Sequence, residues 1–204
     1  MSKITALTIQ KSDKQRCNLF VDGAFLAGIS VETAYKHDLR VDKEIDLKEL
    51  KEIILEGEKA LALSKAIAYI SKTIKTKIQV KNYLLGKGFT EEVCWYAVDK
   101  LKEYGYIDDI EYSKKYFEST RKTQGKRLAD YRLMAKGVKK EDIEKAREDL
   151  PNTEMEDAFN LAVKHLRNKE ITKENLAKTF RYLIGRGFSY ESAENAISKF
   201  KDEI

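Results

Sequence analysis

The chain repeats one short pattern three times, at intervals of 49 and 50 residues, and this repeat limits the possible folds more than any other feature. Each copy is an apolar stretch that ends in a glycine and one further apolar residue: Leu84–Phe89, Leu133–Val138 and Leu183–Phe188. We call Gly88, Gly137 and Gly187 the anchor glycines. A glycine in the left-handed conformation ends a helix and lets the next apolar residue fold back on the last turn. We therefore expect a helix end at each anchor, in an array of units that pack on their neighbours.

Each anchor glycine has two helical patterns before it and one after it. Apolar residues recur three or four positions apart, as they do after the first anchor at Val93, Ala97, Val98 and Leu101. Residues suited to N-capping stand where helices are expected to begin, at Thr90, Asp108, Thr153 and Ser189. Asp108 and Thr153 are also followed three residues later by a glutamate, which is typical of a capping box. Gly105 is expected to end the helix that precedes Asp108.

The predicted fold is mainly helical, with three tandem three-helix repeats in an elongated, curved array. We expect these repeats at residues 58–107, 108–152 and 153–204, after a small β-rich domain with short helices at residues 1–57. A single proline and ten glycines among 204 residues fit long helices with few loops.

The β-rich start is predicted from three stretches of strand-forming residues, Ile4–Ile9, Cys17–Val21 and Ala24–Ile29. Asp22 and Gly23 stand between the last two stretches and suit the positive φ angles of a tight hairpin turn. The sequence therefore predicts a small sheet.

Two helices are expected to follow these strands. Ser30 is a suitable cap for a short helix that extends through Tyr35. Asp46, with Glu49 three residues later, predicts a second helix that runs past Ile54. We expect these helices to cover one face of the sheet.

The apolar stretches are short and interrupted by Lys or Glu, which indicates neither a membrane-spanning helix nor a secretory signal. We therefore expect a cytoplasmic protein that acts as a monomer and does not associate with membranes. The two cysteines, Cys17 and Cys94, are too few for a disulfide framework and lack the spacing of a zinc site. We expect both to be half-buried.

The positive charge of the chain is concentrated in the repeats. Residues 1–60 carry 10 Lys and Arg against 11 Asp and Glu, whereas residues 61–204 carry 29 against 23. Between Lys59 and Thr90 there is no acidic residue, and acids collect instead after the anchor glycines. The first two helices of each repeat are thus basic, and the third is acidic or mixed. Aligned basic helices attract a phosphate backbone without reading its sequence.

Nine basic residues of the first two repeats are the predicted surface for DNA. They are Lys72, Lys75, Lys77, Lys81, Arg121, Lys122, Lys126, Arg127 and Arg132. The alternative is that these side chains only solvate exposed helix faces. Tyrosines also lie near the basic helices and could stack on unpaired bases, but at helical spacing they are more typical of a core. We therefore nominate no stacking tyrosine.

No catalytic or metal site is indicated, and we expect a protein that is not an enzyme and needs no cofactor. His37 and His165 are far apart in the sequence and stand in no triad or metal-ligand pattern. The Gly-Lys-Gly sequence at residues 86–88 does not follow a strand, so it is better explained by helix termination than by phosphate binding. Asp108 and Asp109 lack a third ligand, and Asp108 is expected to cap a helix.

The chain resembles the RecX family of bacterial recombination regulators. The resemblance is carried by Leu84–Phe89, by Leu101-Lys102-Glu103-Tyr104-Gly105-Tyr106-Ile107-Asp108-Asp109, and by Tyr112, Arg121 and Gly125. It covers roughly residues 60–200. The β-rich start resembles the extension of Gram-positive members. Lys114 departs from the family pattern, in which a small or apolar residue is common.

The resemblance implies a regulator that binds the RecA–DNA filament and modulates, most often inhibits, filament assembly and recombinase activity in recombination, DNA repair and the SOS response. It also implies some affinity for single- or double-stranded DNA. Two alternatives stay open: a helical nucleic-acid-binding protein without a recombinase partner, and a purely structural adaptor. A division of labour, with basic helices toward DNA and acidic third helices toward protein, is our own hypothesis.

Overall fold

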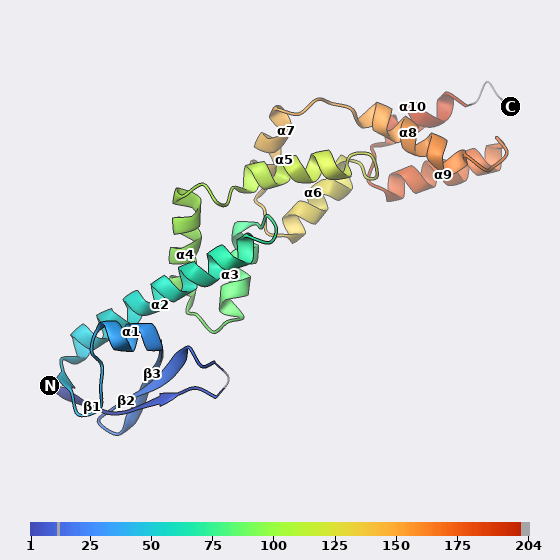
Figure 1. Ribbon diagram of the computed structural model, residues 1–204. Coiled ribbons are helices and arrows are strands. Elements are labelled where there is room, and N and C mark those ends of the chain that lie inside the picture. Colours follow the sequence, from blue (N-terminus) through green and yellow to red (C-terminus); the bar gives the residue numbers. More distant parts are fainter. Residues whose placement is uncertain (12, 201–204) are drawn as a thin grey trace. The chain divides into compact units, whose positions relative to one another are not determined.

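The computed structural model describes residues 1–11 and 13–200, with the elements arranged along the chain as labelled in Figure 1. The chain divides into two compact units. The first unit contains residues 1–74 and 80–106, and the second contains residues 75–79 together with the chain from Ile107 onward.

The first unit begins with a four-stranded antiparallel sheet. Its strands are β1 (Ser2–Ile9), β2 (Arg16–Val21), β3 (Ala24–Ser30) and β4 (Glu44–Ile45), in the order β3-β2-β1-β4. The three predicted strands are confirmed. The two-residue strand β4 was not predicted, because so short a segment has no alternating pattern and forms only by pairing with the start of β1. Asp22 and Gly23 have φ angles of 51° and 83°, as the predicted hairpin turn requires.

Two helices pack with this sheet, and both begin at the predicted caps. Helix α1 (Val31–Lys36) starts with the Thr33 N–H donating to Ser30 Oγ, and α2 (Leu47–Ile70) starts with two N–H groups donating to the Asp46 carboxylate. The core between helices and sheet includes Ile4, Leu19, Ile29 and Leu50. Helix α2 continues without a break through residues 57 and 58, so the β-rich start and the first repeat share one helix.

The remaining chain is helical wherever the structure describes regular elements after residue 58. The helices are α3 (Lys77–Leu85), α4 (Glu91–Glu103), α5 (Asp109–Thr120), α6 (Lys126–Ala135), α7 (Lys140–Glu148), α8 (Glu154–Leu166), α9 (Lys173–Gly185) and α10 (Tyr190–Ser198). Together with α2 they form three successive groups of three, as predicted. The apolar residues close a core around Leu133 in the second group and around Leu183 in the third.

The anchor glycines end the second helix of each repeat in the predicted manner. Gly88, Gly137 and Gly187 have φ angles of 87°, 83° and 87°. The residue after each glycine donates its N–H to a carbonyl five residues earlier, at 3.1 to 3.3 Å, and its side chain is buried. These are the bonds of a Schellman motif. Gly105, with a φ of 69°, ends α4 in the same way, and the Asp108 carboxylate caps α5.

Two sequence expectations are corrected. Thr153 stands at the start of α8, but its hydroxyl donates to the Asp157 carboxylate at 2.6 Å instead of capping the helix. The hydroxyl oxygen accepts from the Arg121 guanidinium at 3.0 Å, where a helix cap would accept from a backbone N–H, and both of its bonds are to charged groups. Cys17 and Cys94 are fully buried, at 5% and 0% exposure, because both lie in the apolar cores.

We predict that replacing Gly187 by Ala destabilises the protein more than replacing Gly88. Ala at Gly88 meets no atom within 4 Å and suffers only from its positive φ, which costs about 1 kcal/mol. A Cβ at Gly187 would also lie 2.5 Å from the backbone nitrogen of Leu128, which raises the expected loss to roughly 2–3 kcal/mol.

Urea unfolding of the two variants measures the difference in the free energy of unfolding. Gly185→Ala is the matched control, since its Cβ would meet nothing within 4 Å and its φ is not positive. We expect this control to be neutral or slightly stabilising. Equal losses at Gly88 and Gly187 would contradict the contact between the third anchor and Leu128.

Candidate nucleic-acid interface

The start of α6 is held against the third anchor by its backbone. Gly125 donates its N–H to the Arg186 carbonyl at 3.0 Å, and Arg127 donates its N–H to the Gly187 carbonyl at 3.2 Å. The Lys126 N–H donates to the Glu154 carboxylate at 3.3 Å, so the first residue of α8 caps α6. A Cβ at Gly125 would collide with the backbone of Phe188, which explains the glycine at this position. The backbone bonds fix where the cations of α6 emerge.

The start of α3, which belongs to the second unit, meets the second anchor in the same way. Thr76 donates its hydroxyl to the Lys136 carbonyl at 2.7 Å, and the Lys77 N–H donates to the Asp109 carboxylate at 3.0 Å. Thr76 and Gln79 also form a capping box. We call these two contacts between successive repeats the joints. In both joints the acidic first residue of a repeat's first helix, Asp109 or Glu154, caps the second helix of the repeat before it.

Lys77 forms ion pairs at the contact between the first and second repeats. Its ammonium lies 3.7 Å from the Asp109 carboxylate and 3.8 Å from that of Asp142, and only 26% of its side chain is exposed. Burial raises the pKa of the Asp109 carboxyl, and the N–H and charge of Lys77 oppose that rise. Removing Lys77 would leave a buried carboxylate without its cation, so this lysine has a structural role.

Two further residues of the predicted surface are held in ion pairs. In the first unit Lys81 pairs with Glu91 and lies 5.0 Å from the Trp95 ring, with 18% of its side chain exposed. In the second unit Arg121 lies 3.4 Å from Asp157, whose side chain is only 7% exposed. The stretch between Lys59 and Thr90, which contains no acid, is thus neutralised in part by acids from elsewhere in the chain, through Lys77 and Lys81.

Three residues of the predicted surface are exposed without a salt bridge among the described residues. Lys72 lies in the connection after α2 in the first unit, whereas Lys122 and Arg127 lie just before and in α6 in the second. Exposed cations of this kind can meet phosphate groups without breaking an internal pair.

The other three members of the predicted surface are held more loosely. Lys126 Nζ donates to Asn152 at 2.9 Å, and Arg132 donates to Gln124 at 2.8 Å, so each cation meets a neutral amide. Lys75 is half-buried and engaged with a neighbouring group. Phosphate is a stronger acceptor than an amide, so Lys126 and Arg132 can exchange their partners for it.

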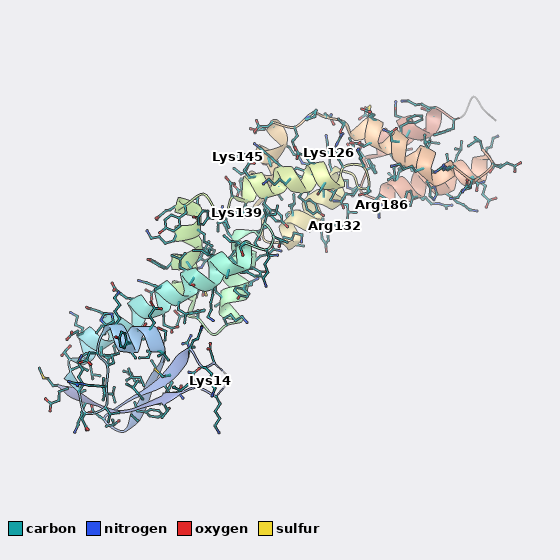
Figure 2. All side chains as sticks on the ribbon, in the orientation of Figure 1. Lys14, Lys126, Arg132, Lys139, Lys145 and Arg186 are labelled. Carbon is teal, nitrogen blue, oxygen red and sulfur yellow. The ribbon has the colours of Figure 1, made fainter. Side chains whose placement is uncertain are left out.

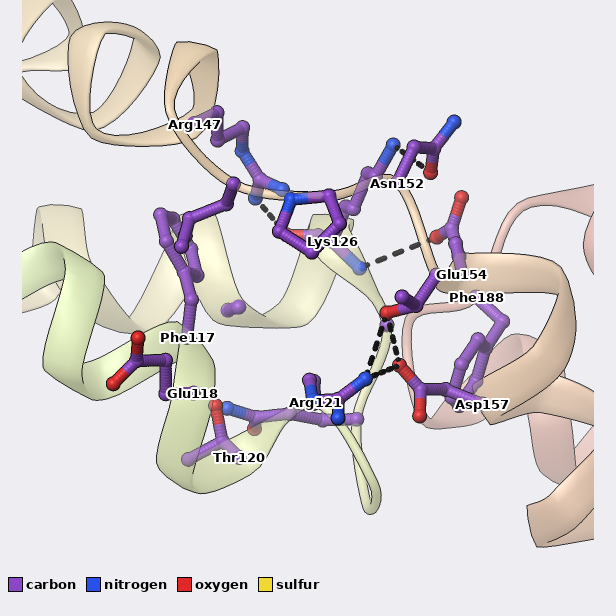
Figure 3. Close-up of a pocket in the computed structure, with 16 residues that line it drawn as sticks. Phe117, Glu118, Thr120, Arg121, Lys126, Arg147, Asn152, Glu154, Asp157 and Phe188 are labelled. Atoms are coloured by element: carbon purple, nitrogen blue, oxygen red, sulfur yellow. Dashed lines mark hydrogen bonds and ion pairs between the residues drawn. The ribbon is translucent and has the colours of Figure 1, made fainter.

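A cavity of about 340 Å³ lies within the second unit, between the second and third repeats (Figure 3). Its apolar wall includes Phe117 and Phe188, and the Arg147 guanidinium lies 4.2 Å from the Phe117 ring centroid. Figure 3 shows Arg121 and Asp157 closing one side. No buried polar side chain among the described residues lacks a hydrogen-bond partner, so the cavity offers no unsatisfied polar group to a ligand.

Comparison with known proteins identifies the family. A family model described as the regulatory protein RecX N-terminal domain matches residues 2–46. A protein named regulatory protein RecX from Clostridium perfringens (strain SM101 / Type A) is 35% identical over 98% of this chain and 96% of its own length. The chain belongs to the RecX family. Another RecX protein, from Clostridium tetani, is 32% identical over 98% of this chain and 94% of its own length.

Solved RecX structures have the same fold. A crystal structure of regulatory protein RecX covers 98% of this chain and 100% of its own, with a TM-score of 0.67 and 25% identity. RecX from Lactobacillus salivarius covers 72% of this chain and 98% of its own, with a TM-score of 0.64 and 22% identity. The predicted family and the predicted fold class, mainly helical after a β-sheet start, are therefore confirmed. A regulatory role follows from the family.

Three cations outside the nine residues of the predicted surface belong to this RecX chain's repeat pattern. Lys87, Lys136 and Arg186 each stand one residue before an anchor glycine, and this recurrence was the available signal. Arg186 donates through Nε to the Thr123 carbonyl at 2.7 Å, close to the start of α6. In Figure 2, Arg132 and Arg186 are labelled along the same edge of the second unit. The cations of the second and third repeats thus include residues of the anchor turns.

The described residues also bear on metal binding and on membrane-spanning helices. Within residues 1–11 and 13–200, no group of three His, Cys, Asp or Glu side chains is placed to hold a metal ion. No helix in the described part of the chain is long and apolar enough to cross a membrane.

The hydrogen-bond geometry around His165 fits a neutral ring. The Thr179 hydroxyl donates to the Asn175 carbonyl, so it accepts from His165 Nδ1 at 3.0 Å. The other ring nitrogen, Nε2, then accepts from Lys169 at 3.0 Å, which only a neutral ring can do. Burial and the Lys169 charge lower the pKa of His165 from its ordinary value of 6.5.

We predict that His165 titrates below pH 6.5 in a nuclear magnetic resonance titration. A lowered folded-state pKa means that the unfolded chain binds the proton more readily. The contribution of this ring to the free energy of unfolding is therefore present above pH 6.5 and is lost as the pH falls below it. His165→Gln should remove that part of the pH dependence, and a His165 midpoint above 6.5 would contradict the neutral ring.

Proposed function

We propose that this protein regulates the RecA recombinase by binding the RecA–DNA filament and modulating, chiefly inhibiting, its assembly and activity in recombination, DNA repair and the SOS response. It acts as a cytoplasmic monomer through binding alone and catalyses no reaction. The observation that carries the proposal is the set of exposed cations Lys72, Lys122 and Arg127, which lie in the connection after α2, in the connection before α6 and in α6. Membership of a regulatory family supports it.

The distribution of charge supports two binding surfaces, a basic one for DNA and an acidic one for protein. The cations named above project from the connection after α2 and from the start of α6, whereas exposed acids such as Glu92, Asp99, Glu141 and Glu148 occupy α4 and α7. A phosphate backbone is attracted to the first set and repelled by the second. The acidic third helices therefore remain available for protein contacts. Each three-helix repeat, at residues 58–107, 108–152 and 153–204, would contribute both surfaces.

The alternative function is a helical nucleic-acid-binding protein without a recombinase partner, which the same exposed cations would also support. The two functions differ in stoichiometry. A plain binder removes DNA from RecA only when it saturates the DNA, whereas a filament regulator acts through contacts with RecA at few sites along the filament.

We predict that this protein lowers the DNA-dependent ATPase rate of RecA at substoichiometric amounts. The measurement is a titration of the protein into RecA on single-stranded DNA, at a fixed salt concentration. Inhibition only when the protein saturates the DNA would favour the plain binder. An unchanged ATPase rate at every ratio of this protein to RecA would contradict both functions.

We predict that the triple substitution Lys72→Glu, Lys122→Glu and Arg127→Glu weakens DNA binding regardless of sequence. The dependence of log K on log salt should become shallower by roughly 0.7–0.9 for each lost phosphate contact. Folding should change little, since these side chains are exposed and form no salt bridges among the described residues. Lys77, Lys81 and Arg121 are left intact because they stabilise the fold.

The matched control is Lys14→Glu, Lys48→Glu and Lys51→Glu, an equal change of charge at exposed lysines of the first unit. This control should keep the salt slope of the unchanged protein. An intact slope after reversal of the predicted set, or an equal loss in the control, would refute the surface. Reversing Glu141 and Glu148 should leave the slope alone and alter only the effect on RecA.

A further inference from the structure

The first repeat carries two stacked rings with a cation over one of them. The rings of Tyr69 in α2 and Tyr83 in α3 have centroids 4.1 Å apart and planes inclined by 3°. The Lys87 ammonium, from the anchor turn, lies 5.5 Å from the Tyr83 centroid. All three residues belong to the first unit.

The third repeat carries the same arrangement with different residues. The rings of His165 in α8 and Tyr182 in α9 have centroids 4.4 Å apart and planes inclined by 8°. The Arg186 guanidinium lies 5.9 Å from the Tyr182 centroid. All three residues belong to the second unit. We call these two arrangements the ring platforms.

The platforms occupy equivalent positions. Tyr83 and Tyr182 each stand five residues before an anchor glycine, and Lys87 and Arg186 stand one residue before it. The partner rings, Tyr69 and His165, are each the last residue but one of the first helix of their repeat. The geometry thus recurs although two of its three side chains have changed type, from Tyr to His and from Lys to Arg.

Core packing alone does not account for this recurrence. The neighbouring residues Leu84 and Leu183 are fully buried and close the core, whereas the four rings are only partly buried. Tyr182 also packs against the core of the third repeat, but packing of this kind needs neither a second ring stacked on the first nor a cation over its face. What Tyr and His share is a flat π-face, and what Lys and Arg share is a positive charge next to it.

We propose that the ring platforms bind unpaired bases of single-stranded DNA, with Lys87 or Arg186 meeting the phosphate of the bound nucleotide. The inference rests on the proposed function and adds a class of ligand to it. Stacking on aromatic rings is the usual way to hold unpaired bases of any sequence, and a cation at the ring serves the backbone. Lys87 is exposed and free of acidic partners among the described residues, so it can follow the phosphate.

The second repeat departs from the platform in an informative way. The places of the two rings are taken by Ser119 and Arg132, and Lys136 stands before the anchor glycine. This repeat therefore offers cations without a ring stack. It should contribute to phosphate binding and not to base stacking.

The test compares the affinity for oligothymidylate with that for an abasic deoxyribose-phosphate strand of equal length and charge. The single variants Tyr83→Leu and Tyr182→Leu remove a ring while keeping an apolar side chain over the core. We expect each to weaken binding of oligothymidylate roughly 5- to 100-fold, and to leave binding of the abasic strand and the salt slope unchanged. Tyr35→Leu and Tyr190→Leu, at exposed tyrosines outside the platforms, should change neither affinity.

Tyr83→Phe and Tyr182→Phe keep the ring, so they should bind oligothymidylate as the unchanged protein does. Unchanged affinity in the Leu variants would overturn the proposal, and so would an equal loss for both strands or a loss in the Phe variants. A Leu variant that loses its helical circular dichroism is replaced by the Met variant at the same position, which gives the same comparison. Failure of the proposed DNA surface would appear separately, as an intact salt slope after charge reversal.

Discussion

The repeats of the second unit depend on the left-handed turns at Gly137 and Gly187. A helix end leaves carbonyl groups without intrahelical partners. The Schellman bonds satisfy some of them, and the preceding repeat satisfies another, through the Thr76 hydroxyl on the Lys136 carbonyl and the Gly125 N–H on the Arg186 carbonyl. Each of these turns therefore ends a helix and also binds the preceding repeat. A side chain at Gly137 would meet Ile78, and a side chain at Gly187 would meet Leu128. Glycine is therefore required both for the helix end and for the contact with the preceding repeat.

The third repeat differs at the place where a further repeat would dock. Helix α9 begins 14 residues before its anchor glycine, one turn earlier than α6, which begins 11 residues before its own. The Thr172 hydroxyl of the chain itself caps α9, instead of an acid from a following repeat. A Lys178–Glu174 pair covers the added turn with charge. Helix α9 is therefore capped within its own repeat, whereas α6 is capped by an acid of the following repeat.

The cations of this RecX protein are divided between holding the fold and facing solvent. Lys77 and Arg121 neutralise buried carboxylates at the joints, where the loss of either would be costly. Lys122 and Arg127 emerge near the same joints and remain exposed. The hydrogen bonds that hold the start of α6 therefore also set the positions of these exposed cations. This proximity links the stability of the repeats to the proposed binding of DNA.

The sequence by itself determined the repeat, the glycine-ended helices, most caps and the hairpin turn, because each depends on residues within about five positions of one another. The tertiary structure alone decided which cations are free, since Lys77 and Asp109 are 32 residues apart and Arg121 and Asp157 are 36 apart. It also decided the strand β4, the hydroxyl partner of Thr153 and the ring platforms. Local periodicity specifies where helices begin and end, but ion pairs and ring stacks depend on which helix faces meet when the repeats pack.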